Sequence, residues 1–142
     1  MKILTIEKEV QINASPTVVF EAITDPNRII SYYPIDTVRS ERKVGGSIIF
    51  SGKNAGHDFT DFGTIEVFDS PHEFRYSFWS DNHGTPRTKE NHMTIQYLLS
   101  SDKNSTKLAL NHINLLTDER KLMMNNVWKF LLNQLKTYAE RA

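Results

Sequence analysis

The fold is decided by the last part of the chain, residues 118–140, which reads DERKLMMNNVWKFLLNQLKTYAE. Its apolar residues recur at intervals of three or four positions: Met124, Val127, Trp128, Leu131, Leu135 and Tyr138. Only the 3.6-residue period of an α-helix brings that spacing onto one face. Acidic residues in the first turn and basic residues near the end also suit the helix dipole. The sequence therefore predicts a long amphipathic helix, which needs an apolar partner surface.

Two short helices are expected near the N-terminus, after an alternating strand over residues 2–13. Ser15-Pro16 and Asp25-Pro26 each join a capping side chain to a proline at the first helical position, where its missing N–H costs nothing. The first helix then covers about 16–24. Pro34 ends the second helix, because the residue before a proline disfavours the helical conformation.

Between the short helices and the long helix, the sequence predicts only β-strands and the loops that join them. Residues 37–43 are polar and read as an exposed edge strand, whereas the polar, glycine-bearing segments 52–61 and 81–90 are expected to be loops. Apolar residues alternate with polar ones in five further segments: 47–51, 63–68, 74–80, 93–99 and 108–112. The element order predicts an α+β fold, in which the long helix covers one face of an antiparallel sheet of six to seven strands.

Composition narrows the class of protein. The 142 residues carry 17 basic and 17 acidic side chains, so the charge balance argues against a general nucleic-acid binder, which needs clustered cations. The chain has no cysteine, which excludes disulfides, thiol nucleophiles and cysteine-based metal sites. No apolar run approaches the length of a membrane span, and no signal peptide precedes the charged residues near the start. We expect one domain over 1–142 in the cytoplasm.

No arrangement of residues predicts a metal, cofactor or catalytic site. The five histidines, at positions 57, 72, 83, 92 and 112, include no pair spaced for one helix face. His57, Asp58 and Asp61 would offer three ligands from one segment, but a polar loop of this kind is usually solvated. Glycines and serines match no phosphate-binding or nucleophile motif. We expect no metal and no cofactor, and favour a binding protein over an enzyme, although carboxylates from separate strands would leave an enzyme open.

The inner face of the predicted sheet is rich in aromatic residues. Strand parity turns the apolar rows toward the long helix, including Ile48, Val67 and Leu108. These rows fit a filled core, and they also fit a cavity in which Tyr76, Tyr97, Trp128 and His112 orient an apolar ligand. The candidate ligand-binding residues are Phe50, Ile65, Phe74, Tyr76, Phe78, Met93, Ile95, Tyr97, Leu110, His112, Met124 and Trp128.

His112 is the one histidine that its position directs inward, because it follows Leu108 and Leu110 at a spacing of two. Two roles fit that position. The fold itself can satisfy the ring, as it does for most buried polar groups. Alternatively, the ring orients the polar group of a ligand. In both cases burial should lower the pKa of His112 below that of a free histidine.

Several segments in register resemble a known family. They are VQINASPTVVFEAITDP at 10–26, VGG at 44–46, GTIEV at 63–67, TKLALNH at 106–112, and Trp128 with Leu132 and Leu135. Together they resemble the SRPBCC or START-like superfamily, more narrowly the homologues of the activator of the heat-shock-protein-ninety ATPase (AHSA-like). The chain departs from that pattern at ISYYP, residues 30–34, where many members carry tryptophan.

The resemblance implies a helix-grip fold of the START and Bet v type, with the C-terminal helix packed over a curved sheet around a hydrophobic cavity. It implies a binding protein for a hydrophobic ligand: aromatic, polyketide- or flavonoid-like, or lipid-like. Two alternatives stay open, because folds of this kind host several functions. One is a chaperone-associated module that binds a protein partner through the outer sheet face, as in a stress response. The other is a cyclase- or hydrolase-type enzyme that uses the same cavity.

Overall fold

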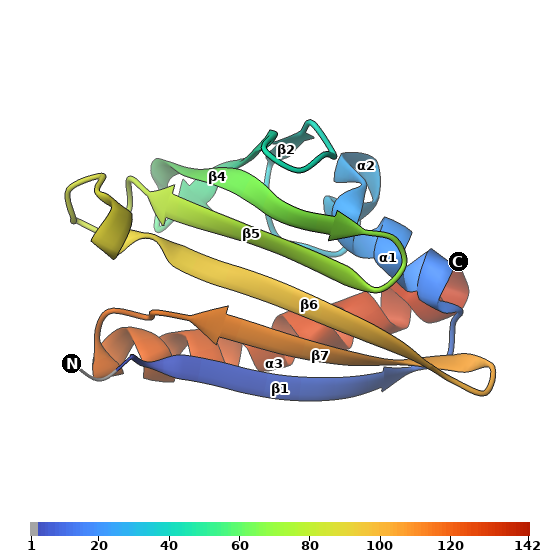
Figure 1. The fold of residues 1–142 in the computed structure, drawn as a ribbon. Coiled ribbons are helices and arrows are strands. Elements are labelled where there is room, and N and C mark those ends of the chain that lie inside the picture. The colour runs from blue at the N-terminus through green and yellow to red at the C-terminus, as the bar shows by residue number, and fades with distance from the viewer. Residues whose placement is uncertain (1–2) are drawn as a thin grey trace.

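The computed structural model describes residues 3–142 and arranges them as one antiparallel sheet of seven strands with helices on one face (Figure 1). The strands follow the order β1-β7-β6-β5-β4-β3-β2 across the sheet. The elements in chain order are β1 (Thr5–Ile12), α1 (Pro16–Thr24), α2 (Pro26–Ile29), β2 (Thr37–Ser40), β3 (Ser47–Asn54), β4 (His57–Asp69), β5 (Glu73–Ser80), a 3-10 turn (Lys89–Asn91), β6 (Met93–Asp102), β7 (Ser105–Ile113) and α3 (Asp118–Arg141). The predicted α+β architecture is confirmed.

The two short helices begin as predicted. The Ser15 hydroxyl accepts the amide N–H of Val18 at 3.3 Å, and the Asp25 carboxylate accepts that of Asn27 at 3.0 Å. Proline stands at the first position of each helix. Both helices lie at one end of the sheet, beside the C-terminal end of α3 (Figure 1).

The long helix is one continuous element, capped by the Thr117 hydroxyl, which accepts the amide N–H of Arg120 at 3.1 Å. Trp128, Leu131 and Leu135 are buried, as the apolar stripe predicts. Val127 was expected on the same stripe and is 37% exposed, so that part of the prediction is wrong. At 3.6 residues per turn Val127 lies about 100° around the helix from Trp128, at the edge of the buried face.

Residues 52–61 were expected to form a loop, and this is wrong. β3 and β4 continue through the segment and pair up to the last two residues, Asn54 and His57. Ala55 and Gly56 form the turn, with φ angles of 52° and 83°. Two positive φ angles in succession are the geometry of a type I′ hairpin turn, which matches the twist of the strands.

Val67 was expected to face inward with Ile65, and this is also wrong. The ladder between β4 and β5 shifts between Ile65 and Val67, so Val67 pairs with Arg75. An extra residue of this kind reverses the parity of the rest of the strand. Phe68 therefore takes the inward position and packs edge-on against Phe20, with ring centroids 5.3 Å apart.

No helix within residues 3–142 is both long enough and apolar enough to cross a membrane.

Candidate ligand site

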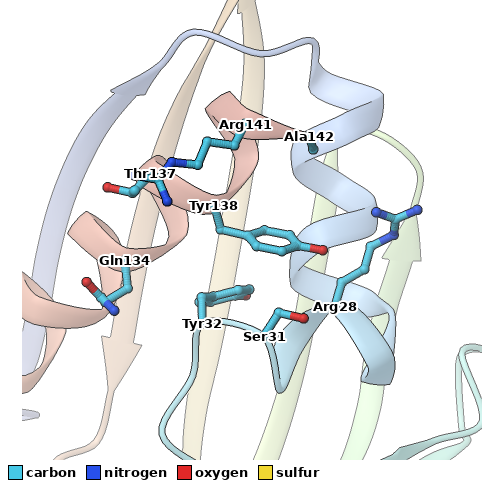
Figure 2. Close-up of a pocket in the computed structure, with 8 residues that line it drawn as sticks. All are labelled: Arg28, Ser31, Tyr32, Gln134, Thr137, Tyr138, Arg141 and Ala142. Carbon is cyan, nitrogen blue, oxygen red and sulfur yellow. The ribbon is translucent and has the colours of Figure 1, made fainter.

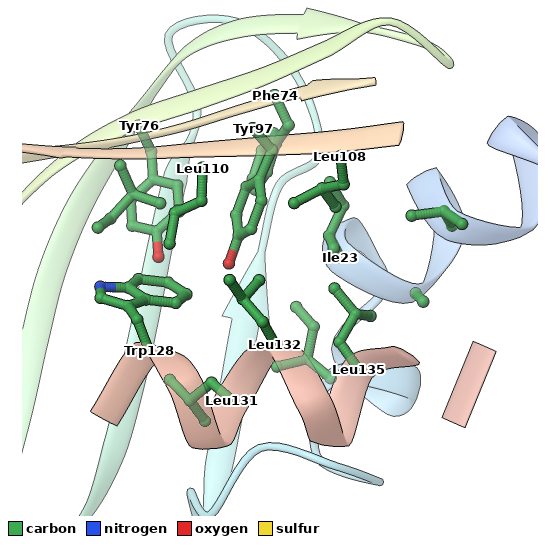
Figure 3. Close-up of a cluster of buried hydrophobic side chains, with 14 of the residues drawn as sticks. Ile23, Phe74, Tyr76, Tyr97, Leu108, Leu110, Trp128, Leu131, Leu132 and Leu135 are labelled. Atoms are coloured by element: carbon green, nitrogen blue, oxygen red, sulfur yellow. The ribbon is translucent and has the colours of Figure 1, made fainter. Parts of the chain in front are cut away.

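The candidate ligand-binding residues all lie on the inner face of the sheet or on the side of α3 that faces it. Figure 3 labels five of them: Phe74, Tyr76, Tyr97, Leu110 and Trp128. All the candidates are buried except Met124, which is half-buried. Many are sealed completely, with no more than 2% of their surface exposed: Ile65, Phe74, Met93, Ile95, Leu110 and His112. These sealed side chains fill the core, as the first of the two interpretations requires.

A second group of inner-face side chains keeps some accessible surface. Phe50 and Tyr76 are 6% exposed, Tyr97 is 7% and Phe78 is 9%. They come from β3, β5 and β6, and two of them, Tyr76 and Tyr97, point toward α3 near Trp128 and Leu132 (Figure 3). The backbone of α3 comes closest to β1 and α1 instead. The side chains of Tyr76 and Tyr97 thus lie between the sheet and α3 (Figure 3).

The hydroxyls of Tyr76 and Tyr97 have no hydrogen-bond partner within residues 3–142. By contrast, the hydroxyl of Tyr32 donates to the Ala22 carbonyl at 2.9 Å. Burial raises the pKa of both Tyr76 and Tyr97 well above the usual value for tyrosine, so both stay protonated. Each hydroxyl can therefore donate a hydrogen bond to an acceptor placed between the sheet and α3.

His112 is satisfied by the fold. The Trp128 indole N–H donates to Nδ1 of His112 at 2.9 Å, and Nε2 lies 3.3 Å from the Met93 sulfur. Because Nδ1 accepts a hydrogen bond, the single ring proton is assigned to Nε2. Burial, with smaller contributions from His83 and Arg120, lowers the pKa of His112 to about 3. The ring is neutral and has both nitrogens in use, which fits the first of its two roles.

Asp61 is a polar residue of the inner face that the sequence interpretation placed in a loop. Its cross-strand partners are Phe50 on β3 and Ser80 on β5, and both are buried. Residues directly opposite one another in a sheet share a face, so the Asp61 carboxyl points inward. Desolvation raises its pKa to about 6; a hydrogen bond with Ser80 opposes that effect, and the charge of Asp81 adds to it.

Strand parity could have found Asp61, since it lies two and four residues before the inward positions Gly63 and Ile65. Tyr33 is a second residue near this site that the sequence analysis did not include among the candidates. It follows α2 in an irregular segment, and its ring packs 5.8 Å from that of Phe50. No periodicity in that segment predicts which way the side chain points.

Two surface pockets lie away from the candidate ligand-binding residues. One, of about 330 Å³, lies between α2 and the last turns of α3, where Tyr32 and Tyr138 sit between Arg28 and Arg141 (Figure 2). Its remaining lining residues are Ser31, Gln134, Thr137 and Ala142. The other, of about 310 Å³, lies between β1 and α3. Neither is lined by any of the candidate ligand-binding residues.

The three possible metal ligands His57, Asp58 and Asp61 do not point to one place. His57 and Asp58 lie exposed at the start of β4, whereas Asp61 faces the interior. Within residues 3–142 no three histidine or carboxylate side chains are placed to hold a metal ion.

Comparison with known proteins identifies the family. The model for proteins described as "Activator of Hsp90 ATPase homolog 1-like protein" matches residues 13–140. The solution structure of ChR145 from Cytophaga hutchinsonii is 30% identical, with a TM-score of 0.85 over 99% of this chain and 97% of that one. A search of the curated proteins found no match.

Two more distant structures share the fold. CalU16 from Micromonospora echinospora is 22% identical, with a TM-score of 0.73 over 95% of this chain and 75% of that one. Ara h 8.0201 is 12% identical, with a TM-score of 0.78 over 99% and 100%. The chain has the helix-grip fold and belongs to the SRPBCC-type family of AHSA1, the Activator of Hsp90 ATPase homolog 1-like proteins.

Proposed function

We propose that this protein binds a hydrophobic small molecule between the inner face of the sheet and α3, in the cytoplasm. The observation that carries the proposal is a pair of tyrosine hydroxyls, on Tyr76 and Tyr97, that point toward α3 and receive no hydrogen-bond partner from residues 3–142. A ligand acceptor that met one of these hydroxyls would contribute about 0.5–1.5 kcal/mol through the hydrogen bond. Ligand sites typically combine apolar and aromatic walls with a few polar groups of this kind.

Fluorescence of Trp128 tests the proposal, since Trp128 packs edge-on against Tyr97 with ring centroids 6.2 Å apart. Trp79, the other tryptophan, is replaced by phenylalanine so that one fluorophore remains. We expect a flavone or the uncharged dye N-phenyl-1-naphthylamine to quench Trp128 with a Kd in the micromolar range, equivalent to about 8 kcal/mol. Unchanged fluorescence with both probes, and no retained small molecule in native mass spectrometry after incubation with cell extract, would contradict binding.

The tyrosine hydroxyls have a matched control. Tyr97→Phe should weaken binding of the flavone, whose carbonyl is an acceptor, by about 3- to 10-fold through loss of one hydrogen bond. Tyr138→Phe removes a hydroxyl from the surface pocket between α2 and α3 and should leave the affinity unchanged. Equal effects of the two substitutions would place the probe outside the proposed site.

A protein-interaction role is the second candidate, and an aromatic row on the outer sheet face favours it. Ile49, Phe62 and Trp79 stand directly opposite one another on β3, β4 and β5, and the Phe62 and Trp79 rings stack 6.3 Å apart. The Arg87 guanidinium lies 4.5 Å from the Phe62 ring centroid. If this face binds a chaperone, the protein should change the ATPase rate of a heat-shock-protein-ninety chaperone, and Phe62→Glu should abolish the change.

A further inference from the structure

Asp61 is half-buried, and its neighbours on the inner face of the sheet are apolar or neutral. Phe50, its neighbour on β3, packs against Tyr33 on one side and Tyr76 on the other, with ring centroids 5.8 and 5.9 Å away. Ser80 is its neighbour on β5. Both tyrosines feel the carboxylate, because its charge raises their pKa values. The carboxyl therefore lies beside the aromatic cluster that Phe50, Tyr33 and Tyr76 form.

No cation of the described chain compensates this carboxylate. The groups that act on its pKa are Ser80, through a hydrogen bond, and Asp81, whose like charge raises it. Tyr33 and Tyr76 face it from the segment after α2 and from β5, and both are neutral. Within residues 3–142 Asp61 belongs to no ion pair, whereas other carboxylates pair with arginine or lysine: Glu9, Glu21, Asp25, Glu66 and Glu140.

We infer that Asp61 is the counter-ion for a protonated amine carried by the hydrophobic ligand. Hydrogen-bond donors alone do not neutralise the charge, and Ser80 already supplies one. An ammonium group would supply both charge and hydrogen bonds, and charge-assisted bonds of that type are the stronger ones. The rings of Phe50, Tyr76 and Phe78 on the same face would receive the apolar body of the ligand and attract its cation. This inference rests on the proposed function and narrows it to amphipathic amines.

The test compares naphthalene probes that differ in charge by isothermal titration calorimetry. They are 2-naphthylethylamine, which is protonated near pH 7.5, its uncharged isostere 2-naphthylethanol, and the anion 2-naphthylacetate. We expect the amine to bind the wild-type protein at least about tenfold more tightly than the alcohol, and the acetate to bind most weakly. Asp61→Asn should remove the preference for the amine. Asp58→Asn, an exposed aspartate of the same strand, should keep it.

A second measurement needs no variant. Because the pKa of Asp61 is raised to about 6, the preference for the amine should shrink between pH 7.5 and pH 5, as the carboxyl takes up a proton. Equal binding of amine and alcohol, or a preference that survives in Asp61→Asn, overturns the inference while leaving hydrophobic binding intact. Failure of all three probes to bind overturns the inference together with the binding function on which it rests.

Discussion

Acid should destabilise this protein through His112. In the folded state the Trp128 N–H lies 2.9 Å from Nδ1 and occupies the position that a second ring proton would need. The ring is 1% exposed, and its pKa falls to about 3, chiefly because of burial. In the unfolded chain the same ring has its ordinary pKa of about 6.5.

The sign and size of the effect follow from these two values. Between pH 6.5 and pH 3 the unfolded state binds more protons at His112 than the folded state, so the free energy of unfolding falls as the pH falls through that window. Each pH unit below 6.5 costs about 1.4 kcal/mol. At pH 5 the loss reaches about 2 kcal/mol, and this value holds wherever the folded pKa lies, provided that it is below 5.

Urea unfolding followed by circular dichroism measures the effect in wild type and in His112→Gln at pH 7.5, 6 and 5. The substitution itself costs stability by an amount that is the same at every pH, so the difference between the two pH curves isolates the titration of His112. His83, whose pKa is lowered to about 4, and Asp61, whose pKa is raised to about 6, titrate in both proteins and cancel. Parallel curves would refute the placement of a neutral, enclosed ring.

Three further changes test the packing, a helix cap and the buried charge. Trp128→Ala should lower the free energy of unfolding by about 3–5 kcal/mol in urea, since it removes a large side chain that is 3% exposed. Thr117→Ala should cost about 1 kcal/mol by leaving the Arg120 amide without its cap, and Thr117→Ser should restore most of it. Asp61→Asn should raise the free energy of unfolding by about 1–3 kcal/mol at pH 7.5, because ionisation of a half-buried carboxyl with a raised pKa favours the unfolded state. That gain should vanish below pH 4, and a gain of equal size at both pH values would contradict the explanation.

The elements with strong local signals could be predicted from the sequence. Ser15 and Asp25 each precede a proline, and both helices begin there. The stripe through Trp128, Leu131 and Leu135 needs a helical period and a sheet to cover it. In each case the local preference of the backbone and the burial of apolar surface favour the same structure.

Two predictions about the strands were wrong: the loop expected at residues 52–61 and the inward position expected for Val67. The strands on either side of Ala55 and Gly56 are polar and long enough to look like a loop, although the turn itself has backbone angles typical of hairpins. At Val67 a single extra residue reversed the strand parity. The hydrophobic pattern of one strand does not reveal a bulge, because the position of a bulge depends on the register with the neighbouring strand.

The candidate site was predicted in outline because parity places Tyr76 and Tyr97 on the inner face. Parity does not reveal which inner residues are sealed completely and which keep some accessible surface, because that depends on the distance between sheet and helix. Phe74 is 1% exposed and Tyr76, two residues away on the same face, is 6% exposed. The sequence pattern predicts the same burial for both residues.

The polar side chains of the interior fall into two groups: those that have a hydrogen-bond or ionic partner in the fold, and those that do not. His112 and Trp128 satisfy each other, and Tyr32 reaches a backbone carbonyl. Within residues 3–142 the Tyr97 hydroxyl has no acceptor and the Asp61 carboxylate has no cation beside it. In a core built for packing alone, both would be replaced without loss by apolar side chains of similar shape. Substituting a satisfied group should therefore lower stability. Substituting Tyr97 or Asp61 should lower ligand affinity without lowering stability, and at Asp61 should even raise stability; that contrast separates a binding surface from a core.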